Sequence, residues 1–125
     1  MPVVFHAAVQ REIFNGTSTY QTLVGDERGS TPIRLGLQSA PPGYETPLHS
    51  HPYLEVLVII SGEGEAWTEE NDGPIRLAEG ITLVLPPNVK HWFRVLGDEP
   101  LKLYGIHASP HRIRHVHDDR QHQKV

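Results

Sequence analysis

The chain has 125 residues, with 15 acidic and 11 basic side chains and a formal net charge of −4. This length suits one domain with a modest core, and the lack of a basic excess argues against a nucleic-acid partner. The chain has no cysteine, which excludes disulfides and thiolate metal sites.

The N-terminal residues do not combine a basic start with an apolar segment, and no apolar stretch approaches the length of a membrane span. We therefore expect no signal peptide and no membrane partner, and a cytoplasmic location is the default. The eleven glycines and eleven prolines favour many short strands joined by turns.

The first fourteen residues are ambiguous. Residues 2–5 fit the start of an edge strand, whereas residues 8–14 fit a short helix that ends at Asn15 and Gly16. The next segments have the β-branched, aromatic and alternating pattern of strands: 19–24, 31–38, 49–51, 55–60, 65–68, 75–77, 81–85, 90–95 and 101–106. Such regular spacing with few helices predicts an all-β antiparallel barrel or sandwich of jelly-roll type.

Residues 43–62 combine two histidines, a glutamate and a dense apolar run. Neutral imidazole and carboxylate are common ligands of divalent metals. On an extended strand His49 and His51 point the same way, roughly 6.6 Å apart between Cα atoms, but Glu55 lies roughly 13 Å beyond. Pro52 cannot donate to a strand ladder, so we expect the chain to bend there and return Glu55 on a second strand.

The apolar run that follows Glu55 is apolar on both faces. Leu57 shares the face of Glu55, whereas Val56, Val58 and Ile60 take the other. That second face needs cover from another sheet or from another subunit, and a second subunit there would form a homodimer.

Gly43, His49, His51, Glu55 and Gly62 occupy every fixed position, at the permitted spacing, of a motif with Gly, His-x-His, Glu and Gly. The stretch therefore resembles the first motif of the cupin superfamily.

A second cupin motif is matched less completely. Gly80, Pro86 and His91 fit, but Asn88 stands where Gly is usual and Val95 where Asn is usual. Asn tolerates the left-handed backbone conformation that Gly would supply, so we expect the first departure to be mild.

The resemblance implies a single cupin barrel over residues 1–110, including an N-terminal strand segment, followed by a polar, His-rich tail over residues 111–125. It implies that His49, His51, Glu55 and His91 bind one divalent transition metal per chain. Iron is favoured, and manganese, nickel, cobalt or zinc also suit such ligands.

Other side chains are candidates for roles near the metal. Glu55 either remains a ligand or detaches to act as a base, and Tyr53 and His107 are the other candidate catalytic residues. Tyr53, Phe93 and Gln38 either line the pocket beside the metal or have ordinary roles, which are core packing for the two aromatic rings and solvent exposure for Gln38.

The C-terminal histidines raise the question of a second metal site. His111 and His115 would share a face if they lay on a helix, but the polar composition favours a solvated tail. The histidines concerned are His107, His111, His115, His117 and His122.

Cupins with this ligand set include enzymes that act on small organic molecules. We expect a metal-dependent enzyme with a small oxygenated substrate, and favour dioxygenase-type oxidoreductase chemistry. A metal-dependent decarboxylase, lyase or isomerase remains open, as does a non-catalytic cupin that binds metal or a small molecule.

Overall fold

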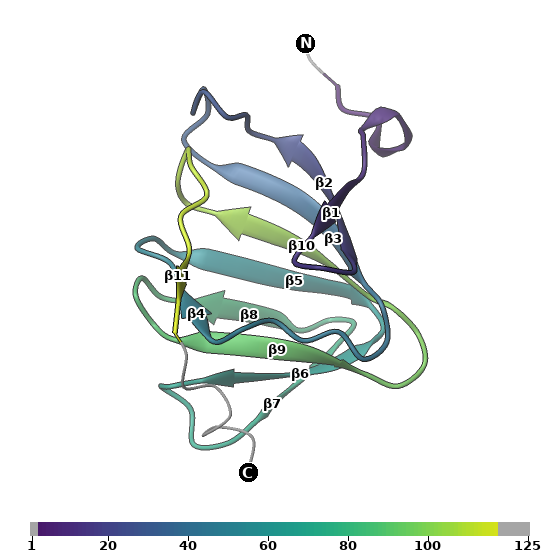
Figure 1. The fold of residues 1–125 in the computed structure, drawn as a ribbon, viewed down its shortest axis with the longest axis vertical. Helices are drawn as coiled ribbons and strands as arrows, with labels where there is room; N and C mark the ends of the chain where they lie inside the picture. The colour runs from purple at the N-terminus through teal and green to yellow at the C-terminus, as the bar shows by residue number, and fades with distance from the viewer. Residues whose placement is uncertain (1–2, 118–125) are drawn as a thin grey trace.

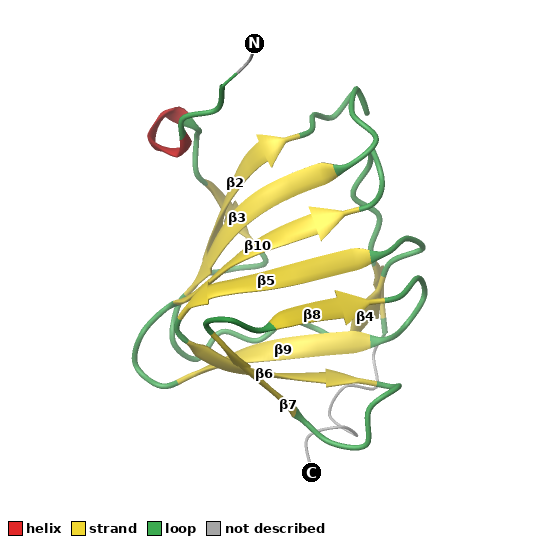
Figure 2. Ribbon diagram, turned by 180° about the vertical axis from the view of Figure 1, so that it is seen from behind, coloured by secondary structure: helices red, strands yellow, loops and turns green. Residues whose placement is uncertain are grey.

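The structure is a computed structural model that describes residues 3–117. Two antiparallel sheets face each other, as predicted for a jelly-roll fold (Figures 1 and 2). The six-stranded sheet has, in spatial order, β1 (Glu12–Phe14), β2 (Ser18–Val24), β3 (Arg34–Ala40), β10 (Leu101–His107), β5 (Glu55–Ser61) and β8 (Thr82–Leu85). The five-stranded sheet has β11 (His115–Val116), β4 (His49–Ser50), β9 (His91–Leu96), β6 (Glu63–Thr68) and β7 (Ile75–Ala78).

The inner faces of three strands are polar at one end and apolar along the rest of their length. Each buries a titratable side chain at one end: Glu55 on β5, His91 on β9 and His107 on β10. The same face continues, at every second residue, with buried apolar side chains. The apolar core includes Leu57, Ile59, Leu77, Leu85, Phe93, Val95, Leu101 and Leu103. One end of the barrel is therefore packed, while the other holds a polar cluster.

The N-terminal segment differs from the predicted helix. A short 3-10 turn, η1, covers His6–Ala8, and residues 12–14 form β1, which pairs with β2. Residues 3–5 form no strand. Asn15 and Gly16, at φ 52° and 94°, make the hairpin turn between β1 and β2. The Asn-Gly pair that was interpreted as the end of a helix therefore forms the turn of a hairpin, because both residues readily adopt positive φ.

Strand β3 alternates as expected, but its two leucines face outward. Leu35 and Leu37 are half-buried, whereas Gly36 and Gln38 point into the barrel. A Cβ atom at Gly36 would collide with the ring of Tyr20. Glycine is therefore required at this position because the tyrosine ring covers the backbone there.

The C-terminal segment does more than extend into solvent. Its side chains over residues 111–116 are exposed, but His115 and Val116 pair with Ser50 and His49. Residues 111–117 form no helix, so the helical arrangement of His111 and His115 does not occur. His122 lies outside the described residues. Among residues 3–117, no helix is long and apolar enough to cross a membrane.

Candidate metal centre

Both sheets contribute to one buried cluster of His49, His51, Glu55 and His91. Within it, the potential ligand atoms all lie within 4.8 Å of one another. His49 and His91 are direct cross-strand partners in the five-stranded sheet, whereas Glu55 begins β5 in the other sheet. The bend predicted at Pro52 is confirmed, because the chain leaves one sheet after β4 and enters the other at β5.

Two of the histidines are oriented by hydrogen bonds to the backbone two residues earlier in the chain. Nδ1 of His49 lies 2.7 Å from the carbonyl oxygen of Pro47, and Nδ1 of His91 lies 3.0 Å from that of Val89. A carbonyl oxygen can only accept, so each ring carries its proton on Nδ1. Nε2 of each ring is thereby left to face the cluster, in the tautomer that a metal requires.

The third histidine is oriented by a distant part of the chain. Nδ1 of His51 donates to the carbonyl oxygen of Ile113 at 2.6 Å, and Ile113 lies two residues before β11, the segment that pairs with β4. The C-terminal segment therefore fixes the ring of His51 in the same tautomer as the other two.

One buried atom of the cluster has no hydrogen-bond partner. Nε2 of His91 makes no hydrogen bond and lies 3.4 Å from Oε1 of Glu55. A buried polar atom without a partner is costly, and a bound cation would satisfy it. This unpartnered atom and the two other Nε2 atoms, of His49 and His51, show that the cluster fits a divalent metal. His49, His51, Glu55 and His91 would hold it.

The two oxygens of Glu55 have different neighbours. Oε1 lies 3.2 Å from Nε2 of His51, whereas Oε2 lies 2.8 Å from Nε2 of His107. Burial alone would raise the pKa of Glu55, but the surrounding histidines, His107 first, hold that pKa well below its ordinary value. Oε1 therefore faces the metal cluster as a carboxylate oxygen, while Oε2 is held from outside it.

The histidines of the cluster differ in their affinity for protons. Burial, with His91 nearby, lowers the pKa of His49 to about 3, so that ring is neutral at physiological pH. Burial would also lower the pKa of His51, but the hydrogen bond and the charge of Glu55, together with the hydrogen bond to Ile113, outweigh burial and raise that pKa. A metal binds the unprotonated Nε2, so metal binding at His51 would compete with a proton at that atom.

Tyr53 and His107 lie behind the cluster and are linked to it. The hydroxyl of Tyr53 lies 2.7 Å from Nδ1 of His107, and it accepts the N–H of Ile113 at 3.2 Å. Burial raises the pKa of Tyr53 to about 12, so the hydroxyl keeps its proton and donates a hydrogen bond to Nδ1 of His107. Nε2 of His107 then carries the ring proton and donates to Oε2 of Glu55.

The cluster opens into a small cavity of about 50 Å³. Gln38 and Phe93 line it, as one of their two interpretations predicted, and so does His107. Tyr53 does not belong to the lining; its ring stacks on His51 at a centroid distance of 5.1 Å. The sequence did not identify several other lining residues, because no motif contains them: Phe14, Asn15, Tyr20, Thr46, Arg112 and Arg114.

The two departures from the second motif have different structural outcomes. Asn88 adopts φ 67°, the left-handed conformation expected of it in place of glycine. Val95 is buried in the apolar core on β9, away from the cluster. Asn88 lies beside the candidate metal site, where its N–H donates to the carbonyl oxygen of His51 at 2.7 Å.

Comparison with known proteins agrees with this architecture. A family model described as "Cupin domain" matches residues 36–107. Auxin-binding protein 1 of Arabidopsis thaliana is 30% identical over 100 residues, covering 74% of this chain and 50% of that protein. Polyketide synthase CurC of Streptomyces cyaneus is 34% identical over 83 residues, covering 66% of this chain and 52% of that protein. The chain thus spans about half the length of these curated relatives.

Solved structures share the fold. A cupin-like protein of Thermotoga maritima superimposes with a TM-score of 0.75 at 26% identity, covering 87% of this chain and 82% of that one. The polyketide cyclase RemF of Streptomyces resistomycificus gives a TM-score of 0.79 at 18% identity, covering 93% and 84% of the two chains. The second likeness shows the fold alone.

Proposed function

Because this chain belongs to the cupin family, we propose that it is a metal-dependent enzyme acting on a small oxygenated organic molecule. The observation that carries the proposal is the orientation of three buried Nε2 atoms and one carboxylate oxygen toward a common point. Backbone carbonyls fix all three histidine tautomers, which is the arrangement of a prepared metal site.

One divalent transition metal per chain, with iron favoured, would be held by His49, His51, Glu55 and His91. Four protein ligands leave one or two positions of an octahedral ion open. A bound metal would polarise an enol, enolate or carboxylate oxygen of the substrate, and iron would add redox chemistry with dioxygen. The cavity of about 50 Å³ beside the cluster suits a small reacting group.

The chain supplies a second set of groups for proton movement. His107 lines the cavity, and it connects the hydroxyl of Tyr53 to the second oxygen of Glu55. Glu55, Tyr53 and His107 are therefore our candidate catalytic residues. If Glu55 leaves the metal, it can accept a proton. If Glu55 stays bound, His107 holds the carboxylate in place.

We favour dioxygenase chemistry, since an open iron position beside an enolic substrate suits it. The hydrogen-bonded chain through His107 specifically favours a second candidate, a non-redox reaction that includes a proton-transfer step. Isomerisation, decarboxylation and cyclisation are examples. The name polyketide synthase, carried by one relative, supports an enolic, oxygen-rich substrate for either reaction.

Homodimerisation forms part of the proposal. Val56, Val58 and Ile60 are only half-buried on the outer face of the six-stranded sheet, and the nearby Val84 is 55% exposed. A second subunit covering this face would remove these side chains from water.

The test begins with metal analysis of the purified protein, followed by oxygen-uptake measurements with enolic and catecholic compounds. We expect about one metal per chain. Iron with substrate-dependent oxygen uptake supports the dioxygenase, whereas turnover without oxygen uptake supports proton-transfer chemistry. Metal binding without any turnover would favour a non-catalytic cupin, and no metal even after reconstitution would contradict the site.

A further inference from the structure

The segment between β10 and β11 crosses the open end of the barrel (Figure 1). Ile113 anchors it there on both sides of its peptide backbone. Its N–H donates to the hydroxyl of Tyr53 at 3.2 Å, and its carbonyl accepts from Nδ1 of His51 at 2.6 Å. This part of the C-terminal segment is therefore fixed against the outer edge of the His51 ring and against Tyr53, beside the candidate metal site.

The anchored residue lies between two arginines. In an extended chain alternate side chains share one side, and both Arg112 and Arg114 line the cavity. The side chain of Ile113 between them is 41% exposed. The alternation thus directs two guanidinium groups toward the mouth of the cavity.

Aromatic rings and an amide hold the two guanidinium groups. That of Arg112 lies over the rings of Phe14 and Tyr20, at 5.7 Å and 5.4 Å from their centroids. That of Arg114 donates to the side-chain oxygen of Asn15 at 2.7 Å. Contact with ring faces leaves the hydrogen-bonding edge of Arg112 available, and a neutral amide does not cancel the charge of Arg114.

Little negative charge opposes these groups. Glu12 lies 4.0 Å from Arg112, at the limit of an ion pair, and its side chain is 52% exposed. Such a contact contributes little in water. The carboxylate inside the cavity, Glu55, is already surrounded by histidines and would face the metal.

We propose that Arg112 and Arg114 form an anion-binding rim that takes a carboxylate of the substrate, while an oxygen at the other end of the same molecule reaches the metal. Both arginines line the same cavity as the metal cluster, so a molecule with one end at the metal would extend its other end toward them. Guanidinium groups match the planar carboxylate in charge and geometry. The substrate is thus a small organic acid with a second, metal-binding oxygen function; this inference rests on the proposed metal site.

The test compares ligands that differ only in the distant carboxylate. The cobalt(II)-loaded protein is titrated with 2-oxoglutarate and 2-oxoadipate, and with 2-oxopentanoate and 2-oxohexanoate, which keep the metal-binding 2-oxo acid but lack the second carboxylate. The visible spectrum of cobalt reports whether the 2-oxo acid reaches the metal. We expect at least one diacid to bind about ten- to a hundredfold more tightly than its monoacid, the range for hydrogen bonds to charged groups.

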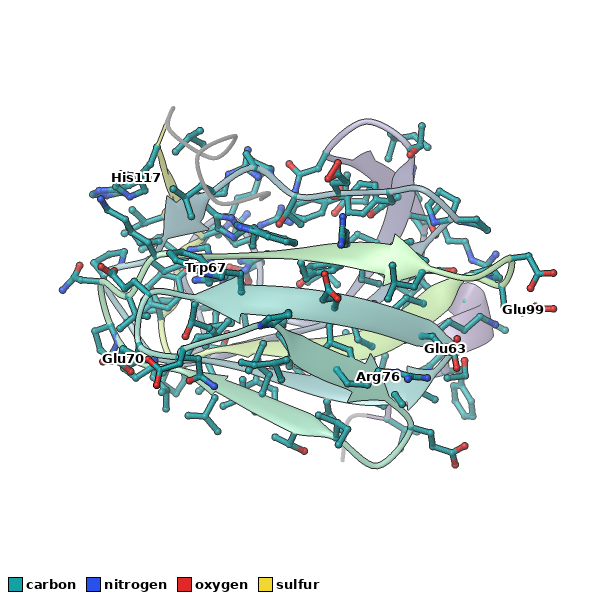
Figure 3. All side chains as sticks on the ribbon, turned by 90° about the horizontal axis from the view of Figure 1, so that it is seen from below. Glu63, Trp67, Glu70, Arg76, Glu99 and His117 are labelled. Carbon is teal, nitrogen blue, oxygen red and sulfur yellow. The ribbon has the colours of Figure 1, made fainter. Side chains whose placement is uncertain are left out.

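Variants assign that preference to the rim. Arg112→Gln and Arg114→Gln should each remove most of it, and Arg112→Lys should keep part of it. Arg76→Gln is the matched control, because Arg76 is an exposed arginine paired with Glu63 on β6, away from His117 beside β11 (Figure 3). Metal content and circular dichroism identify any variant that fails to fold.

The outcomes separate the two proposals. Equal affinity for diacids and monoacids in the metal-loaded protein, or a preference that survives both glutamine variants, would overturn the rim and leave the metal site standing. Failure of the protein to bind cobalt, iron or any other divalent metal would overturn the metal site and the rim with it.

Discussion

Glu55 and His107 lie directly opposite each other in the register of β5 and β10, and Nε2 of His107 is 2.8 Å from Oε2 of Glu55. Cross-strand partners lie close enough for such a contact without any loop rearrangement. The carboxylate is thus held by the sheet itself, and its other oxygen is directed at the histidines.

This pairing predicts the effect of replacing His107. In His107→Phe, Oε2 of Glu55 loses its hydrogen bond, so we expect metal affinity to fall about tenfold, the lower end for residues that orient a ligand. His107→Gln, which retains an N–H donor, should lose less. Competition with a fluorescent chelator measures both constants. Unchanged affinity in the phenylalanine variant would mean that the sheet alone positions Glu55.

The ligand assignment predicts a larger loss at the cluster itself. His49→Ala and His91→Ala should each abolish tight metal binding, because each removes one of four ligands and leaves a buried gap. His111→Ala is the control, since His111 is exposed and outside the cluster. Metal content after dialysis measures the effect. If one alanine variant retains full metal content, that histidine is not a ligand.

The low pKa of His49 predicts that the metal-free protein is destabilised by acid. The ring is neutral in the folded state down to about pH 3, but it protonates in the unfolded state near its ordinary value of 6.5. The unfolded state therefore binds the extra proton, and stability should fall by up to about 1.4 kcal/mol per pH unit below pH 6.

The other two residues of the cluster with shifted pKa values, His51 and Glu55, do not cancel this trend. The raised pKa of His51 stabilises the folded state fully below pH 6.5, the ordinary pKa of histidine. The lowered pKa of Glu55 also stabilises the folded state, and that stabilisation is lost only below pH 4.5. Urea unfolding between pH 6 and pH 4.5 measures the slope, which should shrink in His49→Gln. A slope of zero in the unaltered protein would contradict the neutral state of His49.

The apolar outer face predicts the effect of a charge placed on it. Val58→Lys should shift a homodimer to monomer, because a buried, unpaired ammonium group is costly. Asn71→Lys, in the exposed turn between β6 and β7, adds the same charge elsewhere and should leave the dimer intact. Light scattering coupled to gel filtration measures the mass. A monomeric parent protein would rule the dimer out.

The C-terminal segment predicts a separable effect on metal affinity. Ending the chain after Pro110 keeps all four ligands, so excess metal should still load about one ion per chain. The carbonyl of Ile113 is lost, however, and with it the hydrogen bond that fixes His51. We expect affinity to fall about tenfold. Equal affinity of the full and shortened chains would show that His51 needs no support from this segment.

The sequence predicted those parts of the site that depend on local chemistry. Pro52 marked the bend, because proline cannot donate to a ladder. Asn88 was expected to replace a left-handed glycine, and its φ of 67° confirms this. The grouping of Glu55 with the histidines came from spacing and resemblance together.

Parts that depend on pairing between distant segments could not be predicted. The contact of His107 with Glu55 requires the register of β10 against β5, which no local pattern encodes. Strand β11 has two exposed residues, so it has no apolar alternation to reveal it. The roles of Arg112 and Arg114 follow from that same docking, in a segment whose polar composition indicated only a solvated tail.

The support of the three histidines also has a temporal consequence. His49 and His91 are each oriented by a carbonyl two residues earlier in the chain, whereas the carbonyl that orients His51 comes 62 residues later. A ribosome synthesises the chain from its N-terminus, so the first two rings can be aligned as soon as their own strands form. The third waits for Ile113. A nascent chain therefore exposes an incomplete chelator, and full affinity for the metal arises only once Ile113 has been synthesised and its carbonyl has reached His51.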